Sequence, residues 1–598
     1  MQTRLHSQVV SVLSVLSILV GCTTQVEEET AAPKISDESK QGAAADEVKA
    51  DVVYTNGKIY TVNEAQPWAE AVAIKDGKFL KVGSDTDVKP LVGEETEVIE
   101  LDGKMVMPGI LDLHSHPFIT PWYGQMNLSL KNPGDHEKIL EEVKTYAESH
   151  PDKKWILAGQ WHIGIYPNDA PKKEWLDEIV PDRPVILLDQ SGHNSWLNSM
   201  ALEMSGITKD TPTSNLIVIV KDKDTGEPTG TIREAALQLP ERVIPQATAE
   251  EYAKPIEEIF DMFLSYGITT QQTAEGHRAP LNALKLLESE GRLKQRVFVS
   301  WDWKTTLNLA YTVEDIEEQI KNRAKYESEL IRPNYVKIFA DGSPGARTAL
   351  LLRHYVGEPD FLGQANMSTE EFAAAFTKFD KMGVGVHVHA IGEGSIRRVV
   401  DALELMKKAN GDSGVRHKIA HNWMITPEDI TRVANMKDVN IDFSPHVAYP
   451  HPGIAATFPP RIGDDRYQKM FPVKSAIDAG LHVGQGADWL TANPTPNPFP
   501  AIEGFVTRMN PDDPTMGTLN PSEAVTLAQA IRMCTIEGAW VLGVEEELGS
   551  IEEGKHADFV VLDHNLFDLE KDNKLHRIGD THVLKTIVAG NIVYNTDE

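Results

Sequence analysis

The chain has 598 residues, which exceeds the size of one compact core, so a large domain with a smaller one or with insertions is expected. Its hydrophobic content of 41% and charged content of 25% are ordinary for a globular protein. Its formal net charge of −31 argues against nucleic acid as a partner, because phosphate backbones are bound by basic patches.

The N-terminus carries the features of an export signal. Arg4 precedes an apolar stretch over residues 9–20, which is too short to span a bilayer. The sequence Leu-Val-Gly-Cys at 19–22 then resembles the lipobox of bacterial lipoproteins, in which the cysteine is lipidated and begins the mature chain. We therefore expect residues 1–22 to be a lipoprotein signal peptide, with Cys22 as the lipidation site. An ordinary secretory signal with an incidental cysteine is the alternative.

Residues 23–50 are rich in Glu, Asp, Ala, Ser and Lys and almost lack large apolar side chains, so a disordered tether is expected. A lipid anchor followed by such a tether predicts that the protein is attached to a membrane of a bacterial cell envelope, on the periplasmic face. Thr23, rather than Asp, follows the cysteine. By resemblance to Gram-negative sorting, this favours the outer membrane.

Both ends of the remaining chain predict antiparallel β-structure. Residues 51–83 alternate apolar and polar residues in short runs, which are separated by Asn-Gly at 56–57 and Asp-Gly at 76–77. Both pairs favour type I′ hairpin turns. The alternation returns near the C-terminus, at 556–563 and 583–594. Two β segments from opposite ends can form one domain, so a small β-sandwich is predicted from residues 51–105 and 541–598.

Between these ends, strand-like apolar runs alternate with amphipathic helical stretches, for example at 369–381, 395–408 and 427–436. Such alternation, with parallel strands buried on both faces, predicts a (β/α)8 TIM-type barrel over residues 106–540. The region is longer than a minimal barrel. The surplus is expected as an insertion after the first barrel strand, at about residues 120–254.

The strongest chemical motif is His114-Ser-His116, which ends an apolar run and is followed by Pro117. In a strand, residues i and i+2 point to the same face, so both imidazoles project together. Neutral imidazole is the commonest ligand for zinc-like ions. An isolated His-x-His pair is a weak signal. At the end of a buried barrel strand, where catalytic groups collect, it predicts metal binding.

Lys337 lies inside the apolar, strand-like run at 336–342. Burial of an ammonium group without a partner is unfavourable. Two interpretations therefore stand. The side chain reaches solvent from the edge of its strand, or it serves the site, where carboxylation of its amine would create an anionic metal bridge.

Three further candidates end later strand-like runs. His389 lies nearer the C-terminal end of its run than His387, which is expected to pack one layer deeper. His421 comes shortly before Thr426-Pro427, a helix start, and is therefore placed at the same mouth of the barrel. Asp488 ends its own run and, with metals nearby, is a candidate ligand and proton shuttle.

This order of residues resembles the amidohydrolase superfamily, and its details resemble the branch called amidohydrolase family 3, the YtcJ-like proteins. The matching stretches span nearly the whole mature chain, at 107–116, 192–199, 230–235, 336–343, 389–392, 416–421, 549–558 and 586–594. The chain departs from the family pattern around the expected pocket, at Glu393, Ala420, 443–446 and Ala487. These differences concern the substrate rather than the metal ligands.

The resemblance implies two divalent metal ions, usually zinc, bridged by a carboxylated lysine and a hydroxide. In chain order the ligands would be His114, His116, Lys337, His389, His421 and Asp488. The first metal would take the His-x-His pair with the aspartate, the second would take the two later histidines, and the carboxylated lysine would bridge them.

The resemblance also implies a reaction, namely hydrolysis of a carbon–nitrogen bond other than a peptide bond in a small molecule. An amide, N-acyl or N-formyl group is expected. Asp488 would take a proton from water and pass it to the leaving nitrogen. His193, in the insertion, matches a family position that reaches the substrate and would stabilise the developing oxyanion.

Three alternatives stay open at this point. The same metals could hydrolyse a lactone, a carbamate or a phosphoester. The barrel could instead be a non-catalytic lipoprotein that binds a metal or ligand, although that reading predicts a missing ligand and all six are present. A single metal could also bind, with Lys337 unmodified. The oligomeric state is not encoded in any pattern of this sequence.

Overall fold

The computed structural model describes residues 48–596, apart from 119–127, 131–134, 162, 168–169, 190–193, 214–216, 246, 305–310, 445, 491–492 and 494. From Val48 onward the chain forms one compact unit, and its described residues contain four β-sheets. The predicted signal peptide, Cys22 and most of the predicted tether lie outside the described residues.

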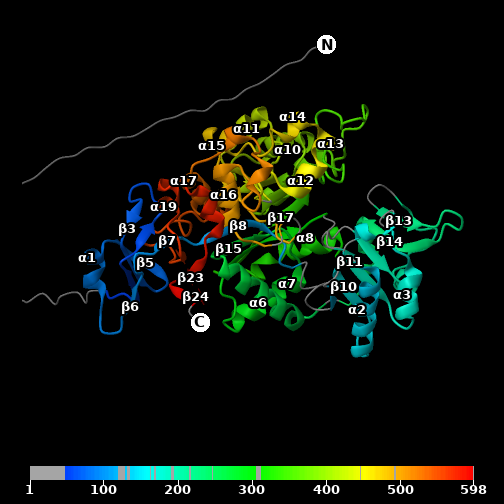
Figure 1. The fold of residues 1–598 in the computed structure, drawn as a ribbon, viewed down its shortest axis with the longest axis horizontal. Helices are drawn as coiled ribbons and strands as arrows, with labels where there is room; N and C mark the ends of the chain where they lie inside the picture. Colours follow the sequence, from blue (N-terminus) through cyan, green and yellow to red (C-terminus); the bar gives the residue numbers. More distant parts are fainter. Residues whose placement is uncertain are drawn as a thin grey trace, which may run out of the picture. The chain divides into compact units, whose positions relative to one another are not determined.

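A β-sandwich joins both ends of the chain. One sheet has the order β5-β4-β1-β6, and the other has the order β24-β23-β22-β7-β2-β3. Figure 1 shows the blue and red strands of the second sheet side by side, and β22 pairs antiparallel with β7. The strands are β1 (Val52–Thr55), β2 (Lys58–Tyr60), β3 (Trp68–Ala69), β4 (Ala71–Lys75), β5 (Lys78–Gly83), β6 (Glu97–Glu100), β7 (Met105–Pro108), β22 (Phe559–Leu562), β23 (Val583–Val588) and β24 (Asn591–Asn595). The predicted β-domain from both chain ends is confirmed.

One of the two predicted hairpins is wrong. Asp76 and Gly77 have φ of 49° and 74° and join β4 to β5, as a type I′ turn requires. Asn56 also has a positive φ of 53°, but the strands on either side of Asn56-Gly57 belong to different sheets. A Cβ on Gly57 would lie 2.6 Å from Leu101 Cδ1. The absence of a side chain on Gly57 therefore lets the chain pass close to Leu101 as it leaves one sheet for the other, and no hairpin forms here.

The centre of the unit is an eight-stranded sheet of parallel strands in the order β21-β20-β19-β18-β17-β16-β15-β8 (Figure 1). Its strands are β8 (Ile110–Ser115), β15 (Ile268–Thr273), β16 (Arg296–Asp302), β17 (Ile331–Phe339), β18 (Gly385–Ala390), β19 (His417–His421), β20 (Val439–Phe443) and β21 (Val483–Gln485). The amide of Asp488, beyond β21, donates to the carbonyl of His114 on β8 at 2.7 Å. This contact brings the first and last strands together, so the predicted TIM-type barrel is confirmed.

Three helices between these strands lie where the local sequence predicts them, with ends that differ by at most two residues. The stretch expected at 369–381 is α9 (Thr369–Lys381), and those expected at 395–408 and 427–436 are α10 (Glu393–Asn410) and α11 (Pro427–Ala434). Thr426 caps α11 through the amide of Asp429. The other principal barrel helices are α6 (Ala249–Ser265), α7 (Arg278–Ser289), α8 (Val313–Lys321), α15 (Val473–Asp478), α16 (Phe499–Thr507), α17 (Leu527–Met533) and α18 (Ile536–Leu542).

A further sheet lies between β8 and α6 in the sequence. Its order is β13-β14-β12-β11-β10-β9, and hydrophobic clusters cover it. Its elements are β9 (Leu128–Ser129), α2 (His136–Ser149), β10 (Ile156–Trp161), α3 (Lys173–Ile179), β11 (Val185–Asp189), β12 (Asn194–Leu197), α4 (Ser199–Met204), β13 (Ile217–Lys221) and β14 (Pro228–Glu234). The additional segment after the first barrel strand thus has its own sheet. In the described part of the chain, none of the helices has both the length and the apolar composition needed to cross a bilayer.

Candidate metal centre

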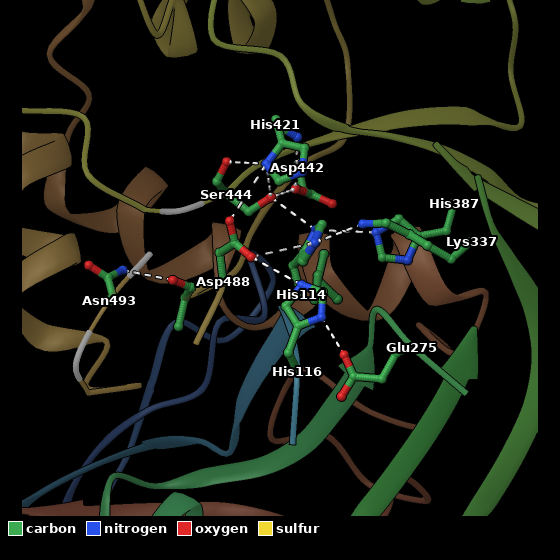
Figure 2. A network of polar contacts seen from close by, with 12 residues as sticks. His114, His116, Glu275, Lys337, His387, His421, Asp442, Ser444, Asp488 and Asn493 are labelled. Atoms are coloured by element: carbon green, nitrogen blue, oxygen red, sulfur yellow. Dashed lines mark hydrogen bonds and ion pairs between the residues drawn. The ribbon is translucent and has the colours of Figure 1, made fainter. Parts of the chain in front are cut away.

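Five of the predicted site residues meet at the C-terminal ends of the barrel strands (Figure 2). His114 is on β8 and His116 follows it, Lys337 is on β17, His421 ends β19, and Asp488 follows β21. All five side chains are buried. Parallel strands of a TIM-type barrel end at one face, which is where enzymes of this architecture hold their catalytic groups.

Asp488 lies between the two histidines of the His-x-His motif. Its Oδ1 is 3.3 Å from Nε2 of His116 and 3.8 Å from Nε2 of His114. One ligand atom from each of these three residues lies within 4.8 Å of the other two. The group has the size and donor types of a metal site.

Lys337 is fully buried, and its Nζ lies 2.9 Å from Nε2 of His114. The predicted escape to solvent at a strand edge is therefore wrong, because the side chain points into the barrel. Burial lowers the pKa of Lys337 to about 7, so the free amine is well populated at neutral pH. A neutral amine is the form that reacts with carbon dioxide.

The ring of His116 is oriented by Glu275, which follows β15. Its Nδ1 contacts one carboxylate oxygen of Glu275, and the other oxygen accepts from the amide of Phe118 at 2.7 Å. A carboxylate only accepts, so Nδ1 carries the proton and Nε2 faces Asp488. Burial alone would lower the pKa of His116, but Glu275 and Asp488 raise it to about 9.

His421 is held in the same way by a backbone carbonyl. Its Nδ1 lies 2.6 Å from the carbonyl oxygen of Ser444, which can only accept, so Nδ1 carries the proton. Nε2 of His421 is buried and has no hydrogen-bond partner within the described residues. Burial lowers the pKa of this imidazole to about 4, so it stays neutral with its lone pair available.

The predicted ligand His389 lies beside this set. Its ring is 4.1 Å from the ring of His421, and its Nε2 is 3.5 Å from the carbonyl of Gly342. That contact leaves Nδ1 as the available ligand atom. His387 packs deeper, as predicted, with Nε2 3.2 Å from Nδ1 of His114. The structure also groups His387 with His114 and Asp442 as a possible ligand set, which the sequence did not indicate.

Asp302, at the end of β16, is a buried carboxylate that the sequence analysis missed. It pairs in register with Lys337. It lies two residues after Ser300, whose hydroxyl contacts His387 inside the barrel, so Asp302 faces the same interior. Both of its oxygens lack a hydrogen-bond partner in the described part of the chain. Burial, with Glu275 nearby, raises its pKa well above the usual range.

These unpaired acceptors show that the residues fit a cation. A buried lone pair on His421 and a buried, unpaired carboxylate on Asp302 are unfavourable without a positive partner. The backbone is consistent with a functional role, because His421 and Asp488 have φ of 75° and 52°. Non-glycine residues in this region are strained, and such strain clusters at functional sites.

Glu275 and Asp302 gave no signal in the sequence, since an isolated acid after a strand is usually a turn or cap residue. Two predicted residues cannot be placed. His193, predicted to contact the substrate, and Cys22 lie outside the described residues.

Comparisons with known proteins identify the relatives of this chain. The sequence profile of the amidohydrolase family matches residues 97–594. The Bacillus subtilis protein YtcJ is 30% identical over 91% of this chain and 99% of its own length. The N-substituted formamide deformylase of Arthrobacter pascens is 28% identical over 91% of this chain and 98% of its own. An uncharacterised metal-dependent hydrolase from Pyrococcus furiosus superposes with a TM-score of 0.67 at 25% identity, covering 86% of this chain and 99% of that structure.

Proposed function

The chain belongs to the amidohydrolase family, and from this premise we propose that it hydrolyses an amide-type C–N bond in a small molecule at a divalent-metal centre. The proposed ligands are His114, His116, Lys337, His389, His421 and Asp488. The deformylase relative matches over nearly the full length of both chains. The deformylation reaction in its name supports an N-formyl or N-acyl substrate.

One observation carries the proposal. For His114 and His116, the contacts of the ring hold Nδ1 against a neighbouring polar group and turn Nε2 toward Asp488. Asp488 also lies 4.0 Å from Nδ1 of His421, and Nε2 of His421 is buried without a hydrogen-bond partner among the described residues. Buried imidazoles around a carboxylate, with one ring nitrogen left without a partner, form a donor set that a cation would stabilise.

Imidazole and carboxylate donors favour zinc. A divalent ion at these ligands would supply Lewis acidity, which lowers the pKa of water and polarises a carbonyl group. The chain itself holds the ligands in place. Glu275 orients the ring of His116, and the carbonyl of Ser444 orients the ring of His421.

We propose that Lys337 is carboxylated and bridges two ions. The free amine forms an N–C bond to carbon dioxide and loses a proton to solvent, which leaves an anionic carbamate in place of the amine. The buried position of Lys337 beside His114 supports this, because it favours the neutral amine and places it among the ligands.

Asp488 is proposed to move the proton. Its carboxylate lies at the centre of the three histidines, where it would accept a proton from the attacking water and deliver it to the leaving nitrogen. His193 is proposed to donate to the developing oxyanion. The reaction then consumes one water and releases an amine and a carboxylic acid.

The experiment that tests this proposal is metal content per chain, in protein that lacks the first 22 residues. We expect about two equivalents in the wild type, and a sharp decrease together with loss of hydrolysis in Lys337→Ala. Lys337→Met, which keeps the volume of the side chain, separates loss of the amine from a packing defect. One equivalent or none, unchanged by either substitution, would contradict the bridge.

The bond is tested with a substrate panel on the wild type. Release of amine from N-formyl and N-acyl amines is expected. Turnover confined to lactones, carbamates or phosphoesters would overturn the C–N assignment while leaving the metal centre intact. Metal binding without any turnover would instead support a binding protein.

We also propose that Cys22 is lipidated and anchors the hydrolase to the periplasmic face of the outer membrane. The apolar stretch at 9–20 and the lipobox-like sequence at 19–22 support this. Metabolic labelling with a fatty acid, followed by membrane fractionation, is the test. Incorporation that persists in Cys22→Ala would refute the anchor.

A further inference from the structure

Ser444, directly after β20, lies behind the candidate ligands and is fully buried. Its hydroxyl oxygen is 3.0 Å from Nδ1 of His114 and 3.2 Å from Nδ1 of His421, and its carbonyl oxygen is 2.6 Å from Nδ1 of His421 (Figure 2). Ser444 therefore contacts Nδ1 of one histidine from each proposed half of the metal centre.

The direction of the Ser444 hydroxyl is fixed by Asp442. Oδ1 of Asp442 lies 2.7 Å from the Ser444 oxygen, and a carboxylate can only accept, so the hydroxyl hydrogen points to Asp442. Asp442 is itself held by Nζ of Lys418 at 2.8 Å. The lone pairs of the Ser444 oxygen consequently face His114, and Ser444 can only accept from that imidazole.

The second neighbour of His114 leaves the position of the proton open. Nε2 of His387 is 3.2 Å from the same Nδ1, and Nδ1 of His387 contacts the hydroxyl of Ser300 at 3.0 Å. Ser300 can donate or accept, so His387 can also be either donor or acceptor toward His114. Of the two groups that contact Nδ1 of His114, Ser444 is therefore the one that requires this nitrogen to carry the proton.

We propose that Ser444 is a positioning residue that sets the tautomer of His114, so that Nε2 presents its lone pair to the first metal. The inference rests on the proposed function. It also predicts an asymmetry between the two ions, because His114 loses its acceptor when the Ser444 hydroxyl is removed, whereas Nδ1 of His421 keeps its closer contact with the Ser444 carbonyl. Removal of the hydroxyl should weaken the metal held by His114 and leave the metal held by His421 nearly unchanged.

The test is zinc affinity of the mature protein, measured by competition with a chromophoric chelator. In Ser444→Ala we expect one of two equivalents to bind about 10–100-fold more weakly, the usual effect of losing a partner behind a ligand, and the other to stay within about threefold. Ser444→Thr and Ser444→Val are matched in shape and differ only in the hydroxyl. The threonine variant should bind as the wild type does, and the valine variant should behave like the alanine variant.

Ser550→Ala is the control outside the site. Ser550 is buried and donates to a carboxylate oxygen of Glu552 at 2.5 Å, so it matches Ser444 in burial and partner. Its removal should leave zinc affinity unchanged.

The outcomes separate this inference from the proposed function. A wild type that binds no zinc overturns both, and one that binds a single equivalent overturns the lysine bridge and the predicted asymmetry. A wild type that binds two, with Ser444→Ala or Ser444→Val equal to it, overturns only the role of Ser444. Equal weakening in the threonine and valine variants would also overturn it, because shape rather than the hydroxyl would then control the affinity.

Discussion

The carboxylate of Glu275 should control metal affinity through His116. Glu275 is buried, and its two oxygens receive Nδ1 of His116 and the amide of Phe118, the latter at 2.7 Å. Glu275→Gln keeps the shape of the side chain but has one acceptor oxygen for two donors, Nδ1–H of His116 and the amide of Phe118. The NH2 group of the glutamine must then face one of these N–H groups. The substitution removes the negative charge that keeps the proton of His116 on Nδ1.

The size of the effect follows from the lost contact. A hydrogen bond to a charged group contributes about 1.5–3 kcal/mol. Each 1.4 kcal/mol corresponds to about a factor of ten in affinity, so the loss amounts to roughly 10–100-fold. The same range is typical when the outer partner of a metal-binding histidine is removed, about 10–100-fold. We therefore expect zinc to bind Glu275→Gln about 10–100-fold more weakly than the wild type.

Chelator competition on both proteins measures this affinity, and hydrolysis at saturating zinc separates binding from turnover. The control is Glu503→Gln on α16, because Glu503 is a buried carboxylate that accepts from the amide of Gly579 at 2.9 Å, outside the candidate centre. Zinc affinity of Glu275→Gln within about threefold of the wild type, or an equal loss in Glu503→Gln, would refute the reasoning.

Three further substitutions test the fold and the charge distribution. Arg296→Ala should lower the free energy of unfolding by about 3–5 kcal/mol, measured by denaturant titration. The substitution removes the guanidinium whose Nε lies 2.9 Å from the buried carboxylate of Asp558, which then loses its charged partner. Asp302→Asn should stabilise the metal-free protein near pH 7, since it removes a buried carboxyl group whose ionised form has no partner among the described residues. Burial raises the pKa of Asp302 in the folded state, so the wild type loses stability as the pH rises above about 4, the pKa in the unfolded state. The gain in melting temperature of Asp302→Asn over the wild type should therefore vanish near that pH and grow toward neutrality. Gly486→Ala should weaken zinc binding and lower the melting temperature, because the new Cβ would lie 2.6 Å from Cβ of His114 and displace β8.

Two of these substitutions have a matched control variant, and the third is checked by its pH dependence. Glu329, the second partner of Arg296, is largely exposed, so Glu329→Gln should change stability by less than about 1 kcal/mol. Gly453→Ala meets only ordinary contacts, with the nearest atom at 3.6 Å, and should leave zinc binding unchanged. A stability difference for Asp302→Asn that does not vary with pH would contradict the buried charge.

Local pattern was sufficient for much of this molecule. The expected helix at 369–381 has the same bounds in the structure, and Thr426 caps the helix that follows His421. The His-x-His pair at 114–116 could be assigned to one face because alternation along a strand is a property of the backbone itself. The barrel followed from the repeated change between strand and helix periods.

The same reasoning failed where one local signal fits two tertiary arrangements. Asn56-Gly57 has the composition of a hairpin turn, yet the strands beside it enter different sheets. Turn propensity describes the bend of the chain and not the partner of the next strand. Lys337 likewise allowed an edge position or an interior one, and only the closed barrel decided between them.

The sequence by itself therefore determined the architecture and the proposed ligand types, since those follow from periodicity and from the chemistry of imidazole, amine and carboxylate. Only the tertiary structure decided which nitrogen of each histidine faces the centre. Glu275 is 159 residues from His116, and Ser444 is 330 residues from His114. The orienting hydrogen bonds join side chains from different strands, and no spacing in the sequence specifies such a contact until the barrel brings those strands together.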